Sequence, residues 1–188
     1  MLPVPAAHLV LVRVKRAVII LLSIVGVIIG LILGIRCISR PPKEAKLLQK
    51  FYVHRSSFER LRDLFQADAG VSRLADWGVE TQDGISKPPA GKFSAERYRQ
   101  YLALLKEGGA LGVSRRDDSH SQVNILLWAR GFAGDIEHVG ICWRTTPPAC
   151  EVASFDAYYR NHPTGRSCDW VYRHIDQNWY LWTDLWQD

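Results

Sequence analysis

The sequence lacks the short motifs that mark common enzyme classes. It contains no HExxH metalloprotease motif, no GxxxxGK[ST] phosphate loop, no GxSxG nucleophile elbow, no GxGxxG dinucleotide motif and no calcium loop. Catalytic groups can also be assembled in space from scattered residues, so the absence of motifs leaves the enzyme question open. We expect no catalytic residue, metal site or cofactor, because the spacing of His, Cys and Asp selects no set of ligands or reacting groups.

Acidic residues are absent from the first forty positions, which hold five of the Lys and Arg residues. The formal charge of +5 belongs to this segment, because residues 41–188 hold nineteen residues of each sign. Binding to a nucleic-acid duplex relies on clustered Lys and Arg that meet phosphates. The mixed charge after residue 40 therefore predicts no nucleic-acid partner.

Charged residues are also absent from Ala17 to Ile35. About 19 residues at roughly 1.5 Å per residue span close to 28 Å, the thickness of a bilayer core. The run is longer than a signal-peptide core and has no small-x-small cleavage site, and Arg36 stands where lipoprotein processing at Cys37 needs a small residue. We therefore expect an uncleaved single transmembrane helix over 17–36 after a cytoplasmic tail at 1–16, with a cleaved signal and an acylated cysteine as alternatives.

Three glycines recur at four-residue spacing within this run, at Gly26, Gly30 and Gly34. They share one helix face and would let a second helix approach closely, which predicts a homodimer through the transmembrane helix. The alternative is that glycine is simply frequent in membrane helices.

Two features of the sequence predict opposite orientations in the membrane. Three basic residues precede the apolar run and five follow it by residue 50, a count that places the carboxyl-terminal side in the cytoplasm. Cys142, Cys150 and Cys168, in a Trp-rich domain, instead suit an oxidising compartment. A disulfide between Cys142 and Cys150 would close a small loop, Cys150 with Cys168 is the competing pairing, and an odd number leaves one cysteine over.

Helical patterns come first along the rest of the chain. Residues 37–68 read as a juxtamembrane helical segment, where "SSFERLRDLF" offers Ser56 as a cap with Glu59 three residues on. Whether this segment is one bent helix or two stays open. "SAERYRQYLALLKEGG" predicts a helix over 95–107, capped by Ser94 and closed by Gly108.

Strand patterns follow the helices. Residues 69–92 show short apolar pieces and then "QDGISKPPAGK", which reads as a loop. "QVNILLWAR" and "IEHVGICWR" predict one hairpin, and "WVYRHI" and "NWYLWTD" predict a second. The order of elements predicts an α+β domain over 69–188, with an antiparallel sheet within 111–186, packed with residues 41–68 as one unit.

Tryptophan and cysteine supply the candidate functional side chains. Trp170, Trp179 and Trp182 could form an aromatic binding patch, although alternation puts Trp179 and Trp182 on opposite faces of a strand, so at least one is expected in the core. Cys142 and His138 lie four residues apart in a strand, too far to hydrogen-bond. A Cys–His hydrolase would need His174 from another strand instead.

Four segments, "FYVHRSSFERLRDLFQAD", "ERYRQYLALLKEGG", "HVGICW" and "YRHIDQNWYLW", give the chain a resemblance over most of 41–188. It resembles a group of small bacterial proteins of unassigned function that pair a signal or membrane anchor with an extracytoplasmic α+β domain. The resemblance implies a location outside the cytoplasmic membrane, with the carboxyl-terminal domain in the periplasm of a bacterial inner-membrane protein. It implies no catalytic residue.

Two functional hypotheses follow. The first is a membrane-tethered, non-catalytic interaction module that binds another envelope protein, such as a toxin, in the manner of membrane-anchored immunity proteins. The second is an envelope hydrolase that acts on wall glycan or peptide through a Trp-lined groove.

Overall fold

The chain divides into two units, Met1–Arg40 and Pro41–Asp188. The structure, a computed structural model, describes residues 23–27, 41–88, 93–115, 121–132, 135–161 and 170–184. In the first unit residues 23–27, which include Gly26, are helical; the rest of the predicted span, with Gly30 and Gly34, lies outside the described residues. Among the described residues, no helix is both long enough and apolar enough to cross a membrane.

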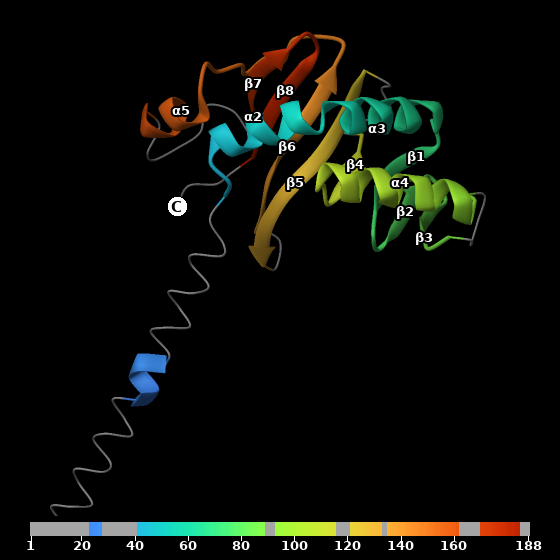
Figure 1. The fold of residues 1–188 in the computed structure, drawn as a ribbon, viewed down its shortest axis with the longest axis horizontal. Coiled ribbons are helices and arrows are strands. Elements are labelled where there is room, and N and C mark those ends of the chain that lie inside the picture. The colour runs from blue at the N-terminus through green and yellow to red at the C-terminus, as the bar shows by residue number, and fades with distance from the viewer. Residues whose placement is uncertain are drawn as a thin grey trace, which may run out of the picture. The chain divides into compact units, whose positions relative to one another are not determined.

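Two separate helices, rather than one bent helix, begin the second unit (Figure 1). Helix α2 spans Glu44–Val53 and helix α3 spans Arg55–Ala67, and the backbone at His54 leaves the helical region with φ −112° and ψ 21°. The predicted cap at Ser56 is wrong, because α3 already begins at Arg55 and makes no side-chain cap bond. Glu59 instead accepts a hydrogen bond of 2.8 Å from Arg55 Nε, one helical turn earlier.

Helix α4 (Ala95–Gly108) is the helix expected over residues 95–107. Ser94 Oγ accepts a 3.1 Å hydrogen bond from the backbone amide of Arg97, which satisfies one of the free amides of the first turn. The left-handed residue that ends the helix is Gly109, with φ 59°, and Gly108 is the last helical residue. A short helix that the sequence patterns did not predict, α5, spans Phe155–Asn161.

Eight strands form one antiparallel sheet in the order β3-β2-β1-β4-β5-β6-β8-β7. The antiparallel α+β prediction and both predicted hairpins, β5–β6 and β7–β8, are confirmed. The strands are β1 (Val71–Ala75), β2 (Gly78–Thr81), β3 (Gly84–Ser86), β4 (Gly112–Ser114), β5 (Gln122–Phe132), β6 (Asp135–Arg144), β7 (Val171–Asp176) and β8 (Trp179–Thr183).

The sheet begins earlier than the predicted range of 111–186. Strands β1 to β3 occupy residues 71–86, and β3 falls in the segment that read as a loop. These strands are only three to five residues long. Such short strands show too few alternating positions to reveal the period of two.

Helices α2, α3 and α4 lie over the same face of the sheet (Figure 1). Phe51 of α2 packs against Phe58 of α3 and Trp179 of β8, with ring centroids 6.3 and 5.6 Å apart. Burial of each such side chain contributes roughly 1.5–3 kcal/mol. The sheet residues that face these helices in the main core include Val113, Ile125, Ile141 and Leu181.

The first turn of α2 is fixed to two distant elements by one buried carboxylate. Glu44 accepts hydrogen bonds from the backbone amide of Phe155 at 2.7 Å and from Ser154 Oγ at 3.1 Å, at the start of α5. It also forms an ion pair with Arg173 of β7. A buried carboxylate with several donors is held in one geometry, so α2 has a fixed rotation about its axis.

Candidate functional site

The sheet has a second face, which points away from α2, α3 and α4. Residues that alternate with the core positions Ile125, Ile141 and Leu181 point to this face. The strand register places one row of such residues side by side across five neighbouring strands. In order from β7 to β4 they are His174, Tyr180, Cys142, Asn124 and Ser114.

A smaller apolar cluster covers part of this face. Cys142, Tyr172, Tyr180 and Trp182 are buried there, with Trp170 packed against them. The rings of Trp170 and Trp182 stack with centroids 4.6 Å apart and an interplanar angle of 19°. This stack joins the residue before β7 to β8 and forms a rigid aromatic surface.

Gly140 of β6 is the residue that lets the indole of Trp182 lie close to the sheet. A Cβ atom at Gly140 would lie 2.7 Å from Trp182 Nε1 and 2.3 Å from the backbone oxygen of Ile125. The same Nε1 donates a 3.2 Å hydrogen bond to the Ile141 carbonyl. The position of the stacked indoles therefore depends on residue 140 being a glycine, which has no side chain.

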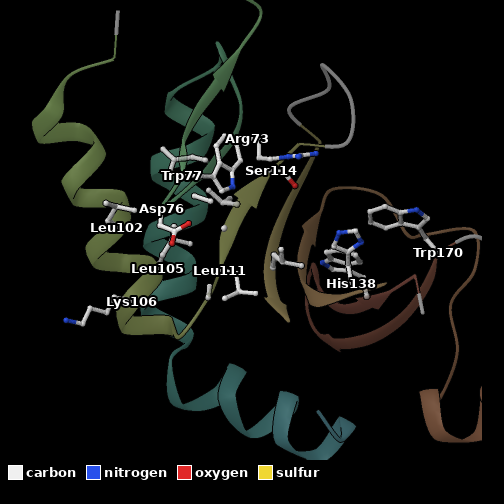
Figure 2. A pocket seen from close by; sticks show the side chains of 17 residues that line it. Arg73, Asp76, Trp77, Leu102, Leu105, Lys106, Leu111, Ser114, His138 and Trp170 are labelled. Carbon is white, nitrogen blue, oxygen red and sulfur yellow. The ribbon is translucent and has the colours of Figure 1, made fainter. Parts of the chain in front are cut away.

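A cavity of about 710 Å³ opens between this aromatic cluster and the β1–β2 turn. Figure 2 shows Trp77 at the turn on one side of the cavity and Trp170 on the other, with His138 between the two. Trp77 is 43% exposed and Leu111, which also lines the cavity, is 50% exposed. The lining also includes Leu102 and Leu105 of α4, the helix that leads into β4 from the other face of the sheet. Such a volume accommodates several side chains of a peptide or one drug-sized molecule.

An oriented imidazole lines the cavity beside the stacked indoles. His138 Nδ1 lies 2.7 Å from Asp184 Oδ2, and the backbone amide of His138 donates to the other carboxylate oxygen. The ring of His138 lies 6.2 Å from that of Trp182. With both oxygens of Asp184 engaged, the ring is held in one orientation, and the pair has the form of a base with an orienting carboxylate.

The three tryptophans of the predicted patch lie on two faces. Trp170 and Trp182 are joined by stacking and line the cavity. Trp179 is 2% exposed and packs against Phe51 on the helix-covered face, so it is not part of the aromatic surface. The alternation of side chains along β8 separates Trp179 from Trp182.

The Cys–His pair that a hydrolase would need is not assembled. Tyr180 stands between Cys142 and His174 in the row across the sheet, so these two residues lie two strands, roughly 10 Å, apart. His174 Nε2 lies 2.8 Å from the Gln177 carbonyl oxygen instead. Burial raises the pKa of the Cys142 thiol far above its ordinary value, which keeps it a protonated, unreactive thiol.

The state of Cys142 distinguishes between the two predicted disulfide pairings. Cys142 is a free, buried thiol, so the predicted Cys142–Cys150 disulfide is wrong. Its place in a packed apolar cluster explains this, because Cys142 is 0% exposed and packs with Tyr172, Tyr180 and Trp182. Cys168 lies outside the described residues, and the Cys150–Cys168 pairing stays a prediction.

No group of three His, Cys, Asp or Glu side chains that could hold a metal ion occurs within the described ranges. The comparisons with protein-family models, with curated proteins and with solved structures find no match to this chain.

Sequence reasoning missed the cavity residues Trp77 and Leu111, and it missed Asp184, which orients His138. Trp77 precedes the tryptophan-rich half of the chain, Leu111 follows the α4 cap, and Asp184 follows the last residue of β8. The pairing of Asp184 with His138 depends on β6 and β8 being neighbours, which neither predicted hairpin indicates. Nothing local in the sequence could have brought Trp77 to the same cavity.

Proposed function

We propose that this chain is a membrane-tethered extracytoplasmic recognition module without a catalytic role, whose cavity binds an apolar segment of another envelope protein. The observation that carries the proposal is the cavity itself, which has tryptophans on two sides and an exposed leucine. Tryptophan is a preferred anchor in protein interfaces because it buries a large rigid surface. The apolar run at 17–35 and the resemblance described above support the tether and the location.

The chemistry of the cavity favours an apolar insert. Trp77 and Leu111 remain 43% and 50% exposed, although burial of such side chains is favourable. A partner side chain inserted between Trp77 and Trp170 would bury all of these surfaces together. A toxin is one class of partner that the tether would suit, in the manner of membrane-anchored immunity proteins.

Site-specific photo-crosslinking in intact cells tests this proposal. A photo-reactive residue at Leu111 is expected to give one discrete adduct with an envelope protein. The matched control replaces Arg60, whose side chain is 67% exposed on α3 and does not line the cavity. In a chain that also carries Trp77→Ala, the Leu111 adduct is expected to fall about thirtyfold, as for loss of an interface anchor. Equal adducts from Leu111 and Arg60, or an adduct that Trp77→Ala leaves unchanged, would contradict the proposal.

A second candidate, an envelope hydrolase, is favoured by the His138–Asp184 pair. The orientation of Nδ1 toward Asp184 leaves Nε2 able to accept a proton from a water molecule, so a water would be the nucleophile. Ser114 lines the same cavity, but the register places it two strands from β6 and in the row of Cys142, four residues from His138. It is too far away to act as the nucleophile.

Isolated cell wall incubated with the purified full-length protein distinguishes the two candidates. Release of soluble fragments by the wild-type protein, lost in His138→Ala and retained in His174→Ala, would replace the recognition proposal with the hydrolase. We expect no fragments from any of the three proteins.

A further inference from the structure

Helix α2 carries a solvent-exposed face with two adjacent large apolar side chains. Tyr52 is 57% exposed and Val53 is 67% exposed. The buried residues of the helix, Glu44, Leu47 and Phe51, lie on the opposite side. The exposed set, called here the α2 outer face, comprises Ala45, Lys46, Gln49, Tyr52 and Val53.

This face has no acidic side chain. The one acid of α2 is Glu44, which points inward to Arg173, Ser154 and the Phe155 amide. Lys46 lies on the same face about two turns before Val53, and Lys43, just before the helix, is exposed as well. Because Glu44 fixes the rotation of α2, these exposed side chains are presented together and in one direction.

The position of α2 in the chain limits what it can meet. The predicted span ends at residue 36, and α2 begins at Glu44. Seven connecting residues reach at most about 25 Å when fully extended. Two of them, Pro41 and Pro42, stiffen the connection. A lipid surface is therefore always within reach of this helix if the span is inserted.

We infer that the α2 outer face docks on the phospholipid surface beside the membrane span, an inference that rests on the tether in the proposed function. Tyrosine favours the headgroup level of a bilayer, and lysine keeps its charge near lipid phosphates while its stem lies in the apolar region. One helix face of this size binds membranes weakly by itself. A short tether raises the effective concentration to about the millimolar range, which makes a weak contact sufficient.

Docking leaves the proposed recognition site free. None of the residues that line the cavity belongs to α2. The contact would restrict rotation of the domain on its short tether, and would therefore present Trp77 and Trp170 in a limited set of directions. Restricting the free states of a binding site reduces the entropy lost on association.

Photo-crosslinking to lipid tests the inference with the full-length protein in liposomes of phosphatidylethanolamine and phosphatidylglycerol. A photo-reactive residue replaces Val53, and the matched control replaces Ile85, which is 71% exposed on β3. Lipid adducts are quantified by mass spectrometry, and retention after an alkaline carbonate wash reports whether the span is inserted. We expect adducts at position 53 to exceed those at 85, and Lys46→Gln to lower the position-53 adducts about fivefold, as for loss of one charge near an anionic surface.

Two results would overturn the inference and can be told apart. If the protein stays in the carbonate-washed liposomes but positions 53 and 85 give equal lipid adducts, the anchor stands and α2 does not dock. If carbonate releases the protein, the anchor in the proposed function fails, and the docking of α2 fails with it.

Discussion

Single residues set the shape of the recognition surface. Trp182 lies against β6 because Gly140 has no side chain, and Trp170 then stacks on Trp182. The sequence could show that tryptophans gather near the end of the chain. It could not show which of them face the cavity, because that depends on the register of β6 with β8 and on contacts between residues far apart in the chain.

Gly140→Ala is expected to destabilise the domain by about 1–3 kcal/mol, because the new methyl group meets a backbone carbonyl as well as the Trp182 indole. Guanidinium unfolding of the full-length protein in detergent, followed by tryptophan fluorescence, measures the change. The matched control is Gly70→Ala, where a Cβ meets nothing within 4 Å, and whose effect is expected to stay below about 1 kcal/mol. Equal losses from the two variants would show that Gly140 is not a close-packed position.

Removal of two different tyrosine hydroxyls is expected to change the unfolding free energy differently. Within the described part of the chain, the Tyr172 hydroxyl is buried without a hydrogen-bond partner. The Tyr98 hydroxyl donates to the carbonyls of Ala75 and Asp76, at 2.8 and 2.9 Å. Tyr98→Phe should therefore cost about 1 kcal/mol of unfolding free energy, and Tyr172→Phe should be neutral or stabilising. A loss on Tyr172→Phe as large as that on Tyr98→Phe would reveal a partner for the Tyr172 hydroxyl.

Elements differ in how well local sequence predicts them. Helix α4 has its cap, its apolar face and its terminal glycine within one short stretch, and it was predicted to within one residue. The strands of the β5–β6 hairpin have 11 and 10 residues, which is long enough to show alternation. The shorter β7 and β8 were recognised from their aromatic and β-branched content on either side of Asp176 and Gln177. The start of α3 was misplaced because Ser56 and Glu59 match a capping pattern that the preceding helix makes unnecessary.

The two serines give a direct test of these helix starts. Ser94→Ala removes the acceptor of the Arg97 amide and should cost about 1 kcal/mol. Ser56 lies inside α3 and is exposed, so Ser56→Ala should be neutral or slightly stabilising, since alanine has the higher helix propensity. Thermal unfolding by circular dichroism compares the two. A larger loss from Ser56→Ala would restore Ser56 as the cap and contradict the observed start of α3.

The whole molecule combines a predicted membrane anchor with a domain of mixed charge. The charge bias beyond the span and the cysteine content give opposite predictions of orientation. The side of the membrane on which the domain lies is set when the span inserts, and it depends on the Lys and Arg residues that flank the span. The sequence resemblance favours the outside, and envelope recognition through the cavity depends on that location.

Thiol labelling of intact cells shows on which side of the membrane the domain lies. The chain carries Ile85→Cys, a position that is 71% exposed, together with Cys37→Ser, and a membrane-impermeant maleimide is added before and after lysis. Peptide mass identifies each labelled cysteine. Cys142, which is 0% exposed, serves as the internal control for an intact fold, because it should react only after denaturation. An extracytoplasmic domain is expected to be labelled at position 85 in intact cells. Labelling there only after lysis would place the domain in the cytoplasm and contradict envelope recognition.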